Sequence, residues 1–390
     1  MINSSADATR NLGLDVVRSA AILMVMACHY GNTFLFWSGV QDPQRFGAAP
    51  GFFGVELFFV LSGFLIGRIL LNIAATRPTR QALLVFLTRR WLRTLPLYIV
   101  WVCLLWAFLP FMHVSASYVL RYLTLTQNFS WLMPDDNFFP VSWSLTVEEW
   151  FYLSFGSLMI LCAAWLKRRA AIWIPIAVFL AVPTIVRCLI PETNPLAEDM
   201  RRVMFLRLDA IAYGAAIAAV SLHHPKWLRY PLPLLILGLS IVVIAWENVL
   251  PLSHRFASAF MFNLSSIGLA LCLPAAIQWR QAPRWFESVA RTISAQSYGL
   301  YIMHLTFIDL VFWARGQWSW LTVPVAMVVS LAAPVVLSWL SFHFFETPIL
   351  NLRPSQARTL MLLPPEANAS VANSNSTLDS DDKFAPVRAR

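Results

Sequence analysis

Two ionisable residues, Arg18 and His29, bracket an apolar run near the start of the chain. The segment from Leu12 to Phe36 reads LGLDVVRSAAILMVMACHYGNTFLF and places Arg18 and His29 eleven residues apart. At about 100° and 1.5 Å per residue, a helix brings both side chains to one face, about 16 Å apart along its axis. An imidazole can act as a general base on a hydroxyl, and an ionisable group deep in a membrane is costly. Two interpretations of His29 remain open: a catalytic group, or a buried histidine bonded to a neighbouring helix.

Two adjacent carboxylates open another apolar stretch, VSWSLTVEEWFYL, at residues 141–153. Neighbouring side chains on a helix point about 100° apart, so at most one of Glu148 and Glu149 is expected to face a common site. A desolvated carboxylate beside an imidazole orients the ring and stabilises its protonated form. We therefore expect Glu149 to hold His29, provided that the two helices pack together. The competing interpretation is that the acids only stabilise the start of a helix through its dipole.

A third stretch, RRWLR, supplies a cluster of cations: Arg89, Arg90 and Arg93. Arg89 and Arg93 share a helix face because they are four residues apart. Guanidinium groups bind phosphates through two hydrogen bonds at once, so the cluster predicts a site for an anionic cofactor. The competing interpretation is that these residues only anchor a helix at the cytoplasmic surface of a membrane.

Polar and aromatic residues inside the remaining apolar stretches are candidates for substrate binding: Glu56, Ser62, Trp143, Tyr301 and His304. Glu56 and Ser62 belong to GFFGVELFFVLSGFLIG, whose small residues favour close packing of helices. His304 falls halfway along its stretch, where it either lines the same cavity or satisfies a buried hydrogen bond. Arg207 and Asp209 are interpreted as a structural pair or as charges at a helix end. No spacing typical of metal ligands is present, so no metal site is expected.

The composition is that of a membrane protein. Hydrophobic residues make up 58% of the 390 residues and charged residues 13%, with a mean hydropathy of +0.62, whereas soluble domains carry about 25% charged residues. Ten apolar runs are long enough to cross a hydrocarbon core of about 30 Å: 14–36, 52–74, 87–109, 144–166, 170–190, 203–222, 231–250, 256–278, 293–314 and 320–345. We predict an all-α bundle of about ten transmembrane helices around a central polar cavity that contains His29.

The chain divides into a membrane domain at residues 1–354 and a polar tail at 355–390, which is expected to be disordered and cytoplasmic. The net charge of +9 does not indicate nucleic-acid binding, because Lys and Arg collect in the cytoplasmic loops of membrane proteins. The loops that contain 77–93, 167–169 and 280–291 are rich in these residues and alternate with loops that are poorer in them. Both termini are therefore predicted to be cytoplasmic. The long connection at 110–141, with Trp131, Asp135 and Asp136, is expected outside as a lid.

These motifs, in this order, resemble the integral-membrane acyltransferase family 3. The resemblance covers residues 12–349 and is carried by LDVVRSAAILMVMACH, GVELFFVLSGFLIG, RRWLR, WSLTVEEWFY, RLDAIAYGA, SYGLYIMH and FFETP. It implies transfer of an acyl group, most often acetyl, from cytoplasmic acyl-CoA to a hydroxyl of a surface polysaccharide or lipid-linked glycan. The family's histidine and arginine fall on His29 and Arg18. Its arginine cluster falls on residues 89–93 and its carboxylate motif on 148–149, while Glu56 stands where the family often has Asp.

The sequence thus predicts an O-acetyltransferase of the bacterial inner membrane, with acetyl-CoA as donor, a glycan as acceptor and the lipid bilayer as its surroundings. His29 would act as general base or form a transient acyl-histidine, and the oligomeric state is left open. A secondary transporter or proton-coupled carrier is the alternative, with Arg18, His29, Glu149 and His304 as an ion pathway. The sequence shows no inverted repeat that would favour it. A non-enzymatic assembly or sensor protein is the other alternative.

The charge asymmetry of the loops leads to a topology prediction. Reporter fusions at either terminus and at Lys167 are expected to report a cytoplasmic location, and a fusion at Asp135 or Asp136 the opposite side. The measurement is the activity of paired reporters that fold on only one side of the membrane. A cytoplasmic location of Asp135 and Asp136 would contradict the prediction.

Overall fold

The computed structural model describes residues 11–41, 44–76, 78–108, 114–129, 138–190, 200–246 and 254–354, and the regular elements in these ranges are all helical. The α-helices are α2 (Leu12–Trp37), α3 (Gln44–Thr76), α4 (Arg80–Phe108), α5 (Ala116–Leu123), α6 (Ser142–Trp165), α7 (Arg168–Leu189), α8 (Leu208–His223), α9 (Pro231–Trp246), α10 (His254–Gln278), α11 (Arg284–Gln317), α12 (Val323–Ser341) and α13 (Thr347–Asn351). Short turns are η2 (Met204–Leu206), η3 (Pro225–Leu228) and the π-helix η4 (Phe342–Glu346). The all-α prediction is confirmed.

Eight helical segments of the described chain are long and apolar enough to cross a membrane. The ten predicted runs all coincide with helices, but α8 and α9 have only 16 residues each. At 1.5 Å per residue these two helices reach about 24 Å, short of a hydrocarbon core of about 30 Å. The class, a polytopic all-α membrane protein, is confirmed, whereas the count of about ten spans is not.

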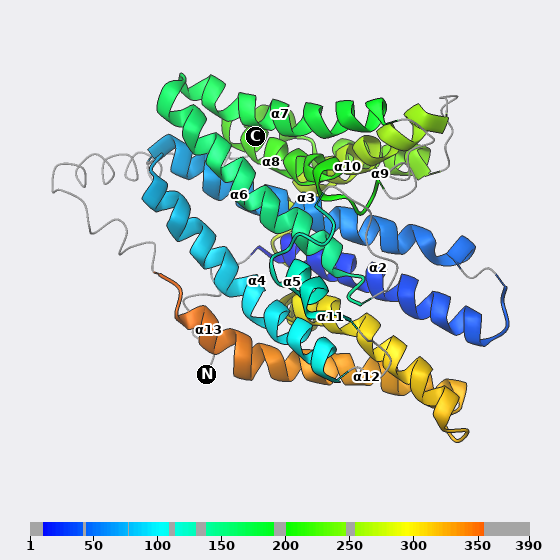
Figure 1. The fold of residues 1–390 in the computed structure, drawn as a ribbon. Helices are drawn as coiled ribbons and strands as arrows, with labels where there is room; N and C mark the ends of the chain where they lie inside the picture. Colours follow the sequence, from blue (N-terminus) through cyan, green and yellow to red (C-terminus); the bar gives the residue numbers. More distant parts are fainter. Residues whose placement is uncertain are drawn as a thin grey trace.

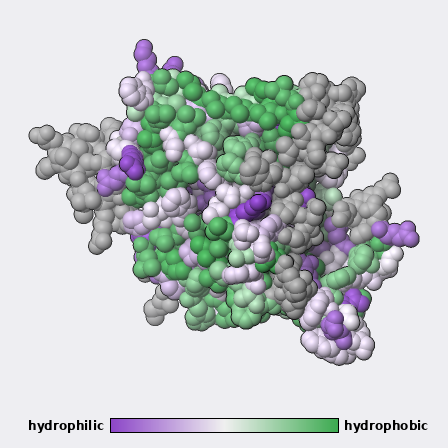
Figure 2. All heavy atoms as spheres, viewed as in Figure 1, coloured by the Kyte–Doolittle hydropathy of each residue, from purple (hydrophilic) through white to green (hydrophobic). Residues whose placement is uncertain are grey.

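The outer surface of the bundle is apolar. Figure 2 shows hydrophobic side chains over much of the visible face, with hydrophilic ones gathered mainly toward its edges. Large apolar side chains stand almost fully exposed, among them Trp165, Phe108 and Leu189. A soluble protein seldom exposes apolar surface on this scale, so these side chains are suited to contact lipid.

The two central helices are α2 and α3. Helix α2 packs against α3, α10 and α11, while α3 also packs against α8 and α6. Figure 1 shows the α3–α4 turn, the α6–α7 turn and α13 at one end of the bundle, and the α2–α3 and α11–α12 connections at the other end. The first end carries Arg80, Lys167 and Arg353, so basic residues gather there as the loop pattern predicts.

The crossing of α3 and α8 depends on two glycines. A Cβ atom on Gly63 would lie 1.8 Å from the carbonyl oxygen of Ile211, and one on Gly214 would lie 2.0 Å from that of Val60. Both distances are far below van der Waals contact, so the two backbones touch directly. The close packing expected from the small residues of SGFLIG is confirmed at this crossing, which fixes the start of α8 beside the middle of α3.

Two buried ion pairs tie these helices to α7 and α10. The Nη2 of Arg207 donates to both carboxylate oxygens of Glu56 at 2.6 and 2.7 Å, and Ser266 donates to the same carboxylate at 3.1 Å. Arg187 donates to Asp209 at 2.6 Å. All four charged side chains are essentially inaccessible to solvent.

These pairs correct two expectations. Arg207 does not pair with Asp209: it precedes the first residue of α8 and reaches Glu56 on α3, whereas Asp209 accepts from Arg187 on α7. Glu56 is not placed to bind substrate, because its carboxylate is engaged by Arg207 and Ser266. Removal of one partner from such a buried pair costs about 3–5 kcal/mol, since the other charge is left unpaired. The Glu56 carboxylate therefore serves the fold.

The glycine crossing gives a prediction of stability. Gly214→Ala is expected to lower the midpoint of thermal unfolding in detergent, because the added methyl must push α8 away from α3, at about 1–3 kcal/mol. Gly31→Ala is the matched control, since a Cβ on Gly31 meets nothing within 4 Å. The measurement is the loss of the monodisperse size-exclusion peak on heating. Equal midpoints for the two variants would show that the crossing tolerates a side chain.

Candidate functional site

A cavity of about 110 Å³ lies where α2, α3, α4, α6 and α11 meet. Its polar lining includes Arg18, Ser62, Arg90, Arg93, Glu148 and Tyr152. Aromatic and aliphatic side chains of α3, among them Phe58 and Leu65, form much of the rest. A cavity with mostly apolar walls and a few converging polar groups is the usual form of a small-molecule site.

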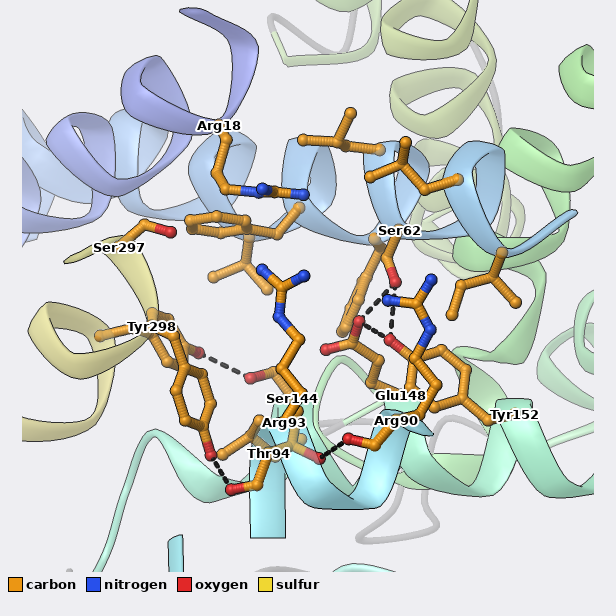
Figure 3. Close-up of a pocket in the computed structure, with 18 residues that line it drawn as sticks. Arg18, Ser62, Arg90, Arg93, Thr94, Ser144, Glu148, Tyr152, Ser297 and Tyr298 are labelled. Atoms are coloured by element: carbon orange, nitrogen blue, oxygen red, sulfur yellow. Dashed lines mark hydrogen bonds between the residues drawn. The ribbon is translucent and has the colours of Figure 1, made fainter. Parts of the chain in front are cut away.

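The charged side chains of the cavity are mainly cations. Arg18 comes from α2, and Arg90 and Arg93 come from α4, while Glu148 is the one acid among the lining residues. Figure 3 shows Arg18 and Arg93 reaching into the cavity from opposite walls. Guanidinium groups held together in this way repel one another, so the cavity favours an anion.

Arg89 differs from the other two arginines of its cluster. Its Nη1 donates to the carbonyl oxygen of Pro354, which follows α13 in the chain. Arg90 and Arg93, three residues apart, therefore form the cavity face in place of the expected Arg89 and Arg93. The adjoining Arg353 has its pKa lowered to about 10, first by burial and then by the repulsion of Arg93, Arg89 and Arg90. Arg353 was missed in the sequence because no motif links it to residues some 260 positions earlier.

Glu148, and not Glu149, is the carboxylate of the cavity. It accepts hydrogen bonds from the hydroxyls of Ser62 and Tyr152 and interacts electrostatically with Arg90. Figure 3 shows these groups on the same side of the cavity. Glu148 thus holds a serine of α3 and a tyrosine of α6 beside a cation of α4.

Glu149 points in another direction. Its carboxylate is buried and accepts a hydrogen bond of 2.6 Å from the hydroxyl of Thr94 on α4. The expected pairing with His29 is corrected, because α6 packs chiefly against α7, α3 and α4, whereas α2 packs against α3, α10 and α11. The two helices that carry Glu149 and His29 are therefore not close neighbours.

The neighbour of His29 is a second histidine. The ring centroids of His29 and His304 lie 5.2 Å apart, with the planes inclined by 52°. The Nδ1 of His304 lies 3.0 Å from the carbonyl oxygens of Leu300 and Tyr301. Carbonyl oxygens only accept hydrogen bonds, so Nδ1 carries the proton. The buried Nε2 of His304 has no hydrogen-bond partner among the described residues.

Tyr301 connects this histidine pair to the cavity. Its hydroxyl, which lines the cavity, forms a 2.7 Å hydrogen bond with Ser144, and its ring centroid lies 6.0 Å from that of His304. His29 itself does not line the cavity and is only half-buried. Since α2 runs unbroken from Leu12 to Trp37, the expected separation of Arg18 and His29 along one helix is kept. A chain of side-chain contacts thus joins the cavity, through Tyr301 and His304, to His29.

Trp143 does not line the cavity and lies instead beside Phe59 and Arg201. Its buried ring meets Phe59 edge to face at 5.8 Å, and the guanidinium carbon of Arg201 lies 5.5 Å from its centroid. Arg201 was also missed in the sequence, because it stands in a loop with no recognisable motif.

Trp131, Asp135 and Asp136 of the expected lid, and the tail at 355–390, lie outside the described residues. Within the described residues, no three His, Cys, Asp or Glu side chains are grouped to hold a metal ion.

The fold and the cavity define a polytopic membrane protein with an arginine-lined cavity, and comparison with known proteins identifies its family. The profile of an acyltransferase domain, that of acyltransferase family 3, matches residues 11–339. The chain belongs to this family. No solved structure matches it.

Three curated relatives illustrate the similarity. The chain is 26% identical to the peptidoglycan O-acetyltransferase OatA of Listeria monocytogenes over 86% of its own length and 55% of that protein. It is 25% identical to the putative peptidoglycan O-acetyltransferase YrhL of Bacillus subtilis, over 86% and 54% of the two chains. A putative O-acetyltransferase of Staphylococcus aureus is 25% identical, over 88% and 59%. The chain therefore spans little more than half the length of these relatives.

The placement of the two acids gives a prediction. Glu148→Ala is expected to lower turnover of acyl-CoA about tenfold or more, because Ser62 and Tyr152 lose their acceptor and Arg90 loses its counter-charge, and hydrogen bonds to a charged group are worth about 1.5–3 kcal/mol each. Glu149→Gln keeps an oxygen for Thr94 and is expected to remain near wild-type turnover. The measurement is the release of coenzyme A by each purified variant. The reverse order of activities would contradict the assignment.

Proposed function

We propose that the protein is a membrane O-acetyltransferase, which moves an acetyl group from cytoplasmic acetyl-CoA to a hydroxyl of an extracytoplasmic acceptor. One observation carries the proposal: a cavity with three arginines is joined to the half-buried His29 by the contacting side chains of Tyr301 and His304. An anionic, elongated donor fits the cavity with its arginines, and a general base fits the pair of His29 and His304. Membership of an acyltransferase family and relatives named O-acetyltransferases support the same chemistry.

Coenzyme A supplies the charges that the cavity lacks. We place its phosphates against Arg90 and Arg93, with Arg18 on the facing wall, and the pantetheine arm along the apolar side chains of α3. Arg353 adds a further cation beside the same cluster. Planar guanidinium groups suit phosphate oxygens because each can donate two parallel hydrogen bonds.

His29 is proposed to act on the acceptor. As general base it takes the proton of the acceptor hydroxyl while the oxygen attacks the thioester carbon, and it returns that proton to the departing thiolate. The alternative of a transient acyl-histidine uses the same residue as nucleophile. His304 offers its free Nε2 as the acceptor that orients the His29 ring, the role that the sequence assigned to Glu149.

The acceptor is proposed to be a sugar hydroxyl of a surface glycan, either a polysaccharide, a lipid-linked precursor or peptidoglycan. Two of the relatives are named for peptidoglycan O-acetylation, which supports a glycan of the cell envelope. We place the protein in the inner (plasma) membrane of a bacterium, since these relatives come from bacteria. The basic end of the bundle, with Arg80 and Lys167, is placed on the cytoplasmic side, because cytoplasmic loops are rich in Lys and Arg.

The proposal predicts a contrast between binding and turnover. His29→Ala is expected to abolish release of coenzyme A in the presence of acceptor and to leave acetyl-CoA affinity unchanged, because the lost interaction belongs to the transition state. Arg93→Ala is expected to weaken acetyl-CoA binding about tenfold or more, since a hydrogen bond to a charged group is worth about 1.5–3 kcal/mol. Isothermal titration and thiol detection on purified protein measure the two quantities.

Arg89→Ala is the matched control, because Arg89 belongs to the same cluster but bonds the Pro354 carbonyl and does not line the cavity. It is expected to bind acetyl-CoA more nearly like the wild type than Arg93→Ala does. A wild-type protein that neither binds acetyl-CoA nor releases coenzyme A would contradict the proposed function and would favour a transporter. A His29→Ala protein with normal turnover would leave His29 a packing residue.

A further inference from the structure

Arg201, in the loop that precedes η2 and α8, is a half-buried cation. Its Nη2 donates to the carbonyl oxygen of Gly51 at 3.3 Å, and its Nε is buried with no hydrogen-bond partner. Its guanidinium carbon lies 4.9 Å from the ring centroid of Phe52 and 5.5 Å from that of Trp143. Among the described residues no ion pair forms at Arg201, whereas the nearby Arg207 is paired with Glu56.

The contacts of Arg201 bring it close to His29. Gly51, which accepts its hydrogen bond, packs so tightly on α2 that a Cβ there would come within 2.5 Å of the sulfur of Cys28. Cys28 directly precedes His29 in the chain. Arg201 also interacts electrostatically with His29, with the carboxylate of Glu56, which is itself paired with Arg207, and with the hydroxyl of Tyr301. These contacts therefore place Arg201 near the pair of His29 and His304.

An unpaired cation in this position is costly. Removing a guanidinium from water without a counter-ion requires several kcal/mol, and a cation over an aromatic face regains only about 0.5–2 kcal/mol. Phe52 and Trp143 hold the group in place but leave its Nε without an acceptor. Such a group is suited to an anion that forms beside it during the reaction.

We infer that Arg201 is a catalytic residue that stabilises the oxyanion of the tetrahedral intermediate in acyl transfer. The inference rests on the proposed function, in which the thioester reaches His29. It extends that function by naming the group that receives the developing negative charge.

The step is balanced as follows. The acceptor oxygen bonds to the thioester carbon, its proton passes to His29, and the π electrons of the carbonyl move onto its oxygen. This oxyanion lies beside the guanidinium of Arg201, which keeps all its protons. When the carbonyl forms again, the carbon–sulfur bond breaks, and the thiolate of coenzyme A takes up the proton from His29.

The test compares Arg201→Gln with Arg202→Gln, a matched neighbour whose side chain is exposed. Removal of one donor to an oxyanion lowers kcat by about 10²–10³. Arg201→Gln is therefore expected to lose that factor in kcat, with the Kd of acetyl-CoA unchanged, and Arg202→Gln is expected to keep wild-type kcat. Hydrolysis of acetyl-CoA without acceptor should fall by the same factor, because attack by water forms the same oxyanion.

Chemical rescue provides an independent measurement. Added guanidinium ion is expected to restore part of the kcat of Arg201→Ala, and Arg201→Lys is expected to be more active than Arg201→Gln. If the neutral variants fail to insert, Arg201→Lys with normal acetyl-CoA binding and a reduced kcat decides the question. The inference is overturned by wild-type kcat in Arg201→Gln, or by reduced transfer with unchanged hydrolysis, which would make Arg201 an acceptor-binding residue. Absence of turnover in the wild-type protein would instead contradict the proposed function.

Discussion

The ion pair between Glu56 and Arg207 holds the centre of the bundle together, and the rest of the site depends on it. Both side chains are fully buried, and the carboxylate also accepts from Ser266. The pair joins the middle of α3 to the start of α8 and to α10, close to where the glycines Gly63 and Gly214 allow the backbones to touch. In an apolar environment neither charge could stay unpaired, so the pair fixes the position of three helices at once.

This requirement for pairing divides the polar groups of the bundle into two sets. Glu56, Arg207, Arg187 and Asp209 satisfy one another and support the fold. Arg90 and Arg93 of the cavity and Arg201 form no salt bridge within the described part of the chain.

The site is assembled from segments that are distant in the sequence. Arg18 lies near the beginning of the chain, Arg93 about a quarter of the way along it, and Tyr301 and His304 about three quarters of the way along. Helix α3 connects these segments, because it packs against both α2 and α6 and contributes one wall of the cavity. His29 is therefore linked to the cavity by Tyr301 and His304 of α11, and not by Glu148 or Glu149 of α6.

The sequence by itself determined the helices and the residues that belong near the chemistry. Apolar runs of sufficient length predict membrane helices with few alternatives, and an eleven-residue spacing puts Arg18 and His29 on one face because the helical repeat fixes the angle. The arginine cluster was likewise recognisable from charge in an apolar context.

Only the tertiary structure decided which side chains are partners. Glu149 was expected beside His29 but meets Thr94, and Asp209 was expected beside Arg207 but meets Arg187. Local periodicity states which way a side chain leaves its own helix, whereas its partner depends on which helices are neighbours, and that is set by packing between segments far apart in the chain.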